Sequence, residues 1–92
     1  MEKQIWKFQF IVADRLSIAM PKDAEILTAQ TQGGMACIWA LINPENEKVQ
    51  RYFEVFGTGN PIPCDTVIER KYIATFEGGG GRLVFHLFER IN

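Results

Sequence analysis

MACIWALI, residues 35–42, is the segment that decides the fold. Two sets of apolar side chains alternate along it: Met35, Cys37, Trp39 and Leu41 on one face, and Ala36, Ile38, Ala40 and Ile42 on the other. An apolar run of this length is typical of a strand that is covered on both faces. We therefore predict a central strand here, preceded by a tight hairpin at Gly33-Gly34, where glycine permits the positive φ angles of the turn.

Apolar and aromatic side chains also recur at every second residue in the flanking sequence, between clusters of Gly, Pro, Asn and Asp. The predicted strands are residues 6–10, 16–20, 25–31, 35–42, 49–56, 72–76 and 83–89. No amphipathic helix of useful length interrupts them. The pattern predicts a mostly β fold, a single antiparallel β-sandwich or flattened barrel of seven short strands.

The alternation also assigns faces within two of these strands. In 25–31, Ile26 is expected to share a face with Thr28 and Gln30, opposite Leu27 and Ala29. In 49–56, Arg51 and Glu54 are expected to reach solvent.

Length and composition indicate one domain over residues 1–92. The chain is shorter than the usual domain of roughly 100–150 residues, and 47% of it is apolar and 12% aromatic. That is enough for a core without a metal, a cofactor or a disulfide. It is also a high apolar fraction for so small a chain, so a homo-oligomer is expected.

The charge distribution and the cysteines limit the classes of partner and the kinds of site that are expected. The formal net charge of -1 is spread along the chain, which argues against duplex nucleic acid and anionic membranes as partners. The N-terminus does not read as a signal peptide, and the apolar run 35–43 is too short to span a bilayer, so a cytoplasmic protein is expected. Cys37 reads as a core residue and Cys64 as a loop residue. Both are expected to be free thiols, and no metal site is expected.

The most unusual motif is the glycine loop formed by Gly57, Thr58, Gly59 and Asn60. Two glycines around a hydroxyl residue can turn successive backbone N–H groups toward an anion such as phosphate, and the Thr58 hydroxyl can add a donor. The loop is neither a P-loop nor a dinucleotide fingerprint, because no Gly-Lys-Ser/Thr follows and prolines prevent a helix there. A strand ending in a tight bend explains the same residues.

Basic and aromatic residues can complete such a site. Arg51, Arg70 and Arg82 lie near strand ends and turns and can bind a phosphate through two N–H groups each. Trp39 and Tyr72 can stack on a purine, although core packing explains Trp39 better.

His86 is the sole histidine. It has no Ser, Cys or carboxylate in a recognisable relay, so it is predicted to be a packed or hydrogen-bonded residue near the ligand, and no catalytic residue is assigned.

Several phrases are familiar in this order: residues 20–27 (MPKDAEIL), 39–42 (WALI), 56–59 (FGTG), 72–76 (YIATF) and 85–89 (FHLFE). Together they resemble an uncharacterised family of small proteins from phages and bacteria. The resemblance implies a stand-alone, phage-encoded protein that acts in the host bacterial cytosol. It supplies no activity and no site residues.

Three functions remain open at this point. The first is a non-enzymatic binding protein that sequesters a nucleotide-derived, phosphate-bearing signal of host immunity. The second is a protein-interaction or anti-defence module that blocks a host protein by strand addition or through an aromatic patch. The third is a small nucleotide-processing enzyme, for which the sequence assembles neither a nucleophile with its base nor a metal set.

Overall fold

The computed structural model describes residues 2–92, which form seven strands and one short 3-10 turn. The strands are β1 (Gln4–Phe10), β2 (Arg15–Pro21), β3 (Glu25–Gln32), β4 (Met35–Ile42), β5 (Lys48–Gly57), β6 (Arg70–Gly78) and β7 (Leu83–Arg90). The 3-10 turn, Gly79–Gly81, forms the tip of the β6–β7 hairpin. The prediction of a mostly β fold with seven short strands is confirmed.

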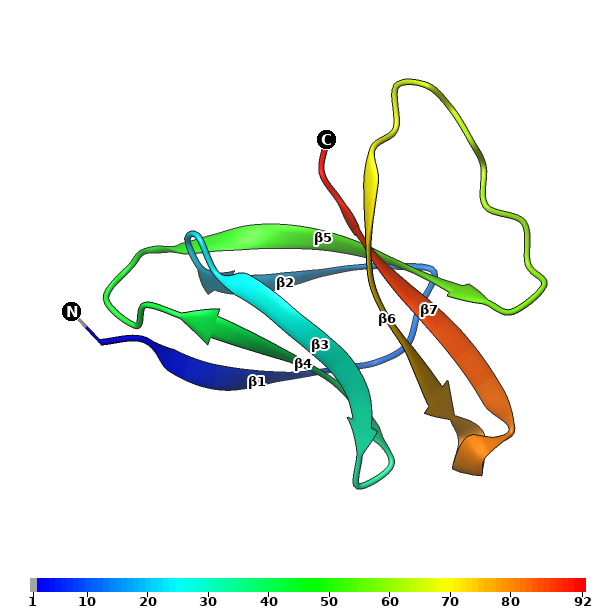
Figure 1. The fold of residues 1–92 in the computed structure, drawn as a ribbon, viewed down its shortest axis with the longest axis horizontal. Coiled ribbons are helices and arrows are strands. Elements are labelled where there is room, and N and C mark those ends of the chain that lie inside the picture. Colours follow the sequence, from blue (N-terminus) through cyan, green and yellow to red (C-terminus); the bar gives the residue numbers. More distant parts are fainter. Residues whose placement is uncertain (1) are drawn as a thin grey trace.

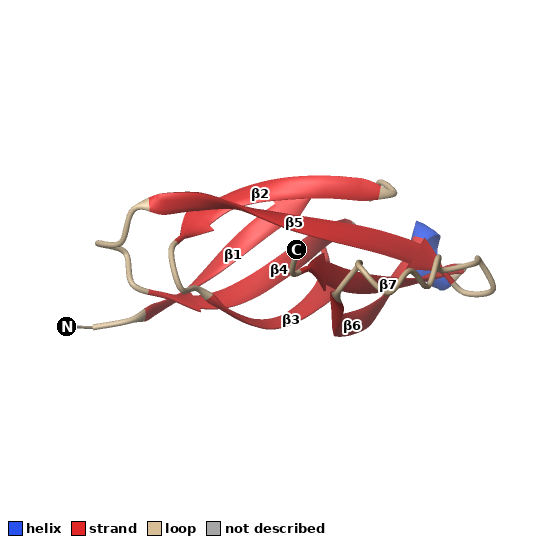
Figure 2. Ribbon diagram, turned by 90° about the horizontal axis from the view of Figure 1, so that it is seen from above, coloured by secondary structure: helices blue, strands red, loops and turns tan. Residues whose placement is uncertain are grey.

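The strands form two antiparallel sheets that pack against each other (Figures 1 and 2). Sheet A has the order β1-β4-β3, and sheet B has the order β2-β5-β7-β6. On one side of the molecule β3 lies beside β6, where the Thr31 hydroxyl donates a hydrogen bond to the Glu77 carbonyl. On the other side, within residues 2–92, β1 pairs only with β4 and β2 only with β5. The sheets therefore do not close into a barrel, and the architecture is a β-sandwich.

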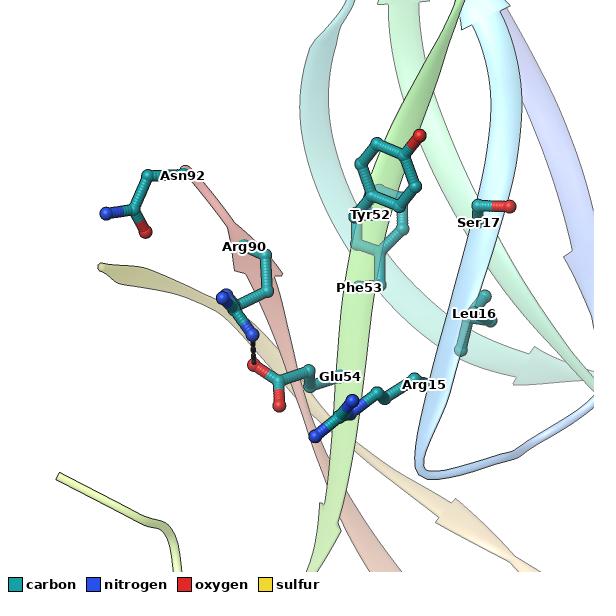
Figure 3. Close-up of a pocket in the computed structure, with 8 residues that line it drawn as sticks. All are labelled: Arg15, Leu16, Ser17, Tyr52, Phe53, Glu54, Arg90 and Asn92. Carbon is teal, nitrogen blue, oxygen red and sulfur yellow. Dashed lines mark ion pairs between the residues drawn. The ribbon is translucent and has the colours of Figure 1, made fainter. Parts of the chain in front are cut away.

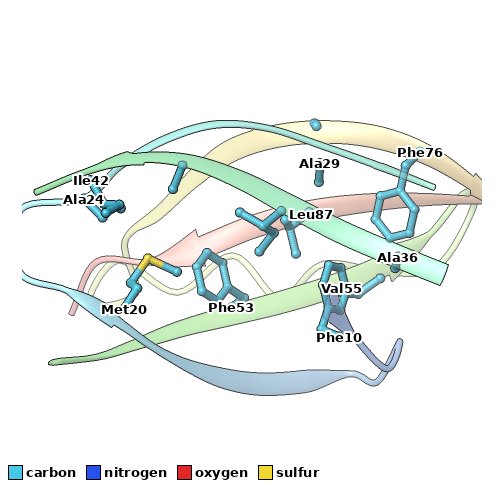
Figure 4. Packing of buried hydrophobic residues seen from close by; sticks show 13 residues of the cluster. Phe10, Met20, Ala24, Ala29, Ala36, Ile42, Phe53, Val55, Phe76 and Leu87 are labelled. Atoms are coloured by element: carbon cyan, nitrogen blue, oxygen red, sulfur yellow. The ribbon is translucent and has the colours of Figure 1, made fainter. Parts of the chain in front are cut away.

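The core is a single layer of side chains between the two sheets (Figure 4). The molecule measures 43 × 36 × 16 Å, so its short dimension has room for two sheets and the layer between them. Sheet A contributes Phe10 and Ile38, and sheet B contributes Phe53, Phe76 and Leu87. The rings of Phe10 and Phe76 meet edge to face at 6.0 Å. Each fully buried side chain of this size stabilises the fold by about 1.5–3 kcal/mol.

The segment 35–42 is the central strand of sheet A, as predicted. Its inner face is buried, with Ile38 fully inaccessible. The outer face is covered only in part, because Cys37 is buried whereas Met35 is 38% exposed and Trp39 is half-buried. The prediction that both faces are covered therefore holds for the inner face and only in part for the outer one.

The turn before β4 has the expected hairpin geometry, with positive φ at Gly33 (58°) and Gly34 (81°). The face assignment in β3 is wrong, because the register against β4 shifts between Ile26 and Thr28. One extra residue turns the strand by one position, so that Ile26 and Ala29 both face the core.

Candidate functional site

The outer face of sheet B carries polar and aromatic side chains. Along β5, Phe53 and Val55 point into the core, so the alternation of a strand sends Glu54 and Phe56 to the opposite face. Their cross-strand neighbours on β7 are Phe88 and His86, and on β2 Arg15 lies opposite Glu54.

Glu54 is the centre of a cluster of arginines. It is only 5% exposed, which contradicts the expectation that it reaches solvent. Arg70 donates a hydrogen bond from Nε to Glu54 Oε1 at 2.8 Å, and Arg90 approaches the same oxygen at 3.7 Å. Arg70 is held further by its bond to the Pro63 carbonyl at 2.7 Å and by the Phe56 ring, whose centroid is 5.6 Å from the guanidinium carbon.

Two arginines of this cluster, Arg15 and Arg90, have N–H donors without a hydrogen-bond partner. Arg90 Nε is buried and has no hydrogen-bond partner in the structure of residues 2–92. Arg15 lies opposite Glu54 in register, yet its exposed guanidinium makes no ion pair or hydrogen bond with the rest of the described chain. Figure 3 shows Arg15 and Arg90 on either side of the Glu54 carboxylate. One carboxylate thus pairs with two cations, Arg70 and Arg90, while Arg15 beside it stays unpaired, and the unused N–H groups favour an additional anion.

Two contiguous grooves open onto this cluster, and Arg15, Glu54 and Arg90 line both of them. The larger groove, of about 810 Å³, runs beneath the β5–β6 loop and is walled by Asn60, Pro61, Pro63 and Ile68 from that loop. The smaller groove, of about 530 Å³, is mainly apolar and lies along β2 and β5, with Tyr52 and Ser17 beside it (Figure 3). Their sizes are those of small-molecule sites.

A second feature of the same face is a chain of hydrogen bonds centred on His86. His86 Nε2 is 2.8 Å from the Thr58 hydroxyl, and Nδ1 is 2.9 Å from the Thr75 hydroxyl. The Thr75 oxygen is also 2.7 Å from the Tyr72 hydroxyl. His86 is therefore a hydrogen-bonded, half-buried residue.

The glycine loop does not form the expected nest of N–H groups. The Thr58 N–H donates to the Val84 carbonyl at 3.2 Å, and the Asn60 N–H donates to the Gly57 carbonyl at 3.0 Å. Neither N–H group is therefore free to bind an anion, because the first extends the β5–β7 pairing and the second closes a turn. Asn60 instead lines the larger groove.

Arg51 belongs to the interior and not to this face. It shares the inward direction of Phe53 and forms an ion pair through Nε and Nη2 with Glu89, itself 6% exposed. Its Nη1 donates to the Ala24 carbonyl at 2.9 Å. The hydrogen bond to Glu89 raises the pKa of the Arg51 guanidinium above its ordinary value, against the opposing effect of burial. The expectation that Arg51 reaches outward toward a phosphate is wrong, because strand parity turns it toward the core.

The residues that the sequence suggested for ligand binding do not all lie together in the structure. One group gathers on the outer face of sheet B and in the loop beside it: Gly57, Thr58, Gly59, Asn60, Arg70, Tyr72 and His86. Trp39 lies on the other sheet, where its cross-strand neighbours are Lys7 and Thr28. Arg82 lies at the β6–β7 hairpin tip, next to the 3-10 turn. Neither belongs to the groove.

Sequence reasoning missed Arg15, Glu54 and Arg90. The predicted strand 16–20 leaves out Arg15, which is the first residue of β2, and the predicted strand 83–89 leaves out Arg90, which is the last residue of β7. Of these three residues, only Glu54 could have been placed from the sequence. It lies between Phe53 and Val55, so the alternation of a strand must turn it away from them.

Both cysteines are free, with Cys37 buried and Cys64 exposed. Within residues 2–92, no three His, Cys, Asp or Glu side chains are grouped so that they could hold a metal ion. The same residues include no helix with the length and apolar character needed to cross a membrane.

Comparison with known proteins adds one finding about the whole chain. A family model described as Domain of unknown function (DUF7352) matches residues 1–92. No curated protein and no solved structure matches the chain.

Proposed function

The chain belongs to the family described as Domain of unknown function (DUF7352), and from its own geometry we propose that it binds a small, phosphate-bearing, nucleotide-like ligand without altering it. The ligand lies in the two contiguous grooves on the outer face of sheet B. The observation that carries this proposal is the excess of arginine N–H groups around Glu54.

The charged part of the ligand site is the region that the two grooves share. Arg70 is already used, because Glu54, Pro63 and the Phe56 ring hold it in place. The Arg15 guanidinium is exposed and unpaired, and the Arg90 side chain, which is 29% exposed, has a buried Nε without a partner. Arginine binds phosphate oxygens through two parallel N–H groups, so these two side chains can hold one phosphate between them.

The apolar part of the ligand site is the smaller groove along β2 and β5. Tyr52 is 58% exposed there and offers the face or edge of its ring to a flat group. A nucleotide combines the two chemistries that the grooves offer, since its phosphate is anionic and its base stacks on aromatic side chains.

The biological role that we propose is sequestration. A protein that holds a ligand without changing it lowers the ligand's free concentration. Because the sequence resembles proteins of phages and bacteria, we propose a nucleotide-derived signal of host immunity as the ligand, bound in the host cytosol.

Isothermal titration calorimetry with pyrophosphate, ADP-ribose and a cyclic dinucleotide tests this function. At least one nucleotide should bind, and Arg15→Ala and Arg90→Ala should each weaken it about tenfold or more, since a hydrogen bond to a charged group contributes about 1.5–3 kcal/mol. The matched control is Arg82→Ala, which removes an exposed arginine outside the grooves. Absence of heat with all three compounds, or equal losses in the control, would contradict the proposal. Recovery of a chemically altered nucleotide would show an enzyme instead.

One observation favours the second candidate, a module that binds a host protein. Within the described chain β1 and β2 each have a free edge, and the connection between them exposes Ile11 and Val12. A partner strand can add to such an edge. Purification of the protein with a stoichiometric bacterial protein, lost when proline replaces Lys7 or Ser17, would favour this candidate over the binding of a nucleotide.

A further inference from the structure

The hydrogen-bond chain at His86 has the geometry of an activated hydroxyl. Thr58 Oγ1 lies 2.8 Å from His86 Nε2, which is hydrogen-bonding distance between a nucleophile and its base. On the far side of the ring, Nδ1 lies 2.9 Å from the Thr75 hydroxyl, which in turn lies 2.7 Å from the Tyr72 hydroxyl. The order is therefore nucleophile, imidazole and orienting group, as in hydrolases that use a serine and a histidine.

The fold fixes these distances. Thr75 and His86 are direct cross-strand partners on β6 and β7, so the orienting hydroxyl and the imidazole are held by the ladder of sheet B. Thr58 lies just after β5, and its backbone N–H is bonded to the Val84 carbonyl on β7. Two strands and one backbone bond thus hold the three groups together, which is the rigidity that a reactive site requires.

The hydroxyl is open to an incoming molecule. Thr58 is exposed, and the next residue, Gly59, has a φ of 88° with no atom of the described chain, apart from its two chain neighbours, within 4 Å of the position that a Cβ would occupy. The Gly59 N–H makes no hydrogen bond within residues 2–92. In hydrolases with a nucleophile on a sharp turn, the N–H of the residue after the nucleophile binds the negative oxygen that forms during attack.

We propose that Thr58 is a nucleophilic hydroxyl, that His86 is its general base, and that the site accepts an acyl group from a carboxylic ester. Thr58 Oγ bonds to the carbonyl carbon while its proton passes to His86 Nε2. The alkoxide then leaves with the electron pair of the broken C–O bond and takes that proton, which yields an alcohol and an ester of Thr58. Water, activated by the same imidazole, hydrolyses this ester to a carboxylic acid and restores the hydroxyl.

Thr75, the third group of the hydrogen-bond chain, affects the rate of this reaction. Thr75 is a positioning residue, because its neutral hydroxyl orients the imidazole without supplying the negative charge that a carboxylate would. In a serine protease, replacing the triad carboxylate by a neutral amide lowers kcat by about 10⁴. Slow acyl transfer is therefore expected at Thr58. The proposal does not depend on the groove around Glu54.

A fluorophosphonate probe tests the site directly. Its phosphorus mimics the tetrahedral intermediate, and attack by the hydroxyl forms an O–P bond and expels fluoride while the proton goes to His86. Peptide mass spectrometry should locate the adduct at Thr58. Thr58→Val should abolish it and Thr58→Ser should retain it, whereas Thr66→Val, a change at an exposed threonine of the same loop, should leave labelling unaltered.

His86→Gln keeps a hydrogen-bonding side chain but no base, and should slow labelling by about 10²-fold or more. The wild-type rate should rise with pH, because only a neutral imidazole can accept the proton of the hydroxyl. Thr75→Val should lower the rate and alter this pH profile, a result that a purely structural role would not give. No adduct at Thr58, adducts spread over many hydroxyls, or an unchanged rate in His86→Gln would overturn the proposal. If His86→Gln does not fold, equal labelling of the Thr58→Val and wild-type proteins would do so.

Discussion

Replacing Arg51 by methionine removes the partner of a buried carboxylate while keeping most of the side chain's volume. The Arg51 and Glu89 side chains are 22% and 8% exposed, and Arg51 also bonds to the Ala24 carbonyl. Loss of one partner of a buried ion pair costs about 3–5 kcal/mol, because the other charge stays buried and unpaired. Since Arg51 is partly solvated, we expect the lower end, about 3 kcal/mol. For a domain of this size that corresponds to a fall in Tm of about 12–24 °C.

Urea unfolding followed by the fluorescence of Trp6 and Trp39 measures this change, with an unaltered m-value showing that stability alone has moved. Replacing both Arg51 and Glu89 by methionine should recover at least about 1 kcal/mol relative to the single variant, because no unpaired charge remains. Arg82→Met is the control and should stay within about 0.5 kcal/mol of wild type. A loss below about 0.5 kcal/mol in Arg51→Met, or a double variant less stable than the single one, would refute the reasoning.

Three further substitutions distinguish residues that bind the ligand from residues that stabilise the fold. Tyr52→Ala should weaken nucleotide binding by about 1–3 kcal/mol while leaving pyrophosphate binding unchanged in calorimetry, because stacking is lost and the charges remain; equal losses for both ligands would contradict the assignment. Glu54→Gln should tighten pyrophosphate binding about tenfold by removing a repelling charge, and should lower the free energy of unfolding by about 1–2 kcal/mol because Arg70 loses its charged partner; weaker binding in this variant would argue against an anion there. Gly78→Ala should destabilise the fold by about 1–3 kcal/mol, since a Cβ would lie 2.8 Å from Phe85 Cε2, and a urea midpoint at the wild-type value would show that the ring moves aside freely.

The strands could be predicted because each carries its own period-two pattern. Residues 35–42 are the clearest case, since an apolar run bounded by glycines and an Asn-Pro turn specifies a strand without knowledge of its neighbours. The register of β3 could not be predicted, because nothing in the side-chain pattern marks the extra residue between Ile26 and Thr28. A bulge depends on the partner strand, and pairing between distant strands is not contained in a local pattern.

The candidate site was partly predictable for the same reason. Arg70 and His86 were placed near a ligand from residue type alone, and both lie on the outer face of sheet B. Arg15 and Arg90 were missed because they are far apart in the chain and meet only through the β2-β5-β7 order of that sheet. Arg51 was placed on the wrong side because its buried partner, Glu89, is 38 residues away and the sequence does not show the pairing.

The most direct test of the anion site is an NMR titration of the ¹⁵N-labelled protein with pyrophosphate, followed through the Nε–H signals of its arginines. Binding in the shared groove should move the signals of Arg15 and Arg90, whose donors are free, and should leave those of Arg82 and of the Trp39 indole in place. Unchanged Arg15 and Arg90 signals at saturating pyrophosphate, or shifts confined to Arg82 or Trp39, would contradict the account.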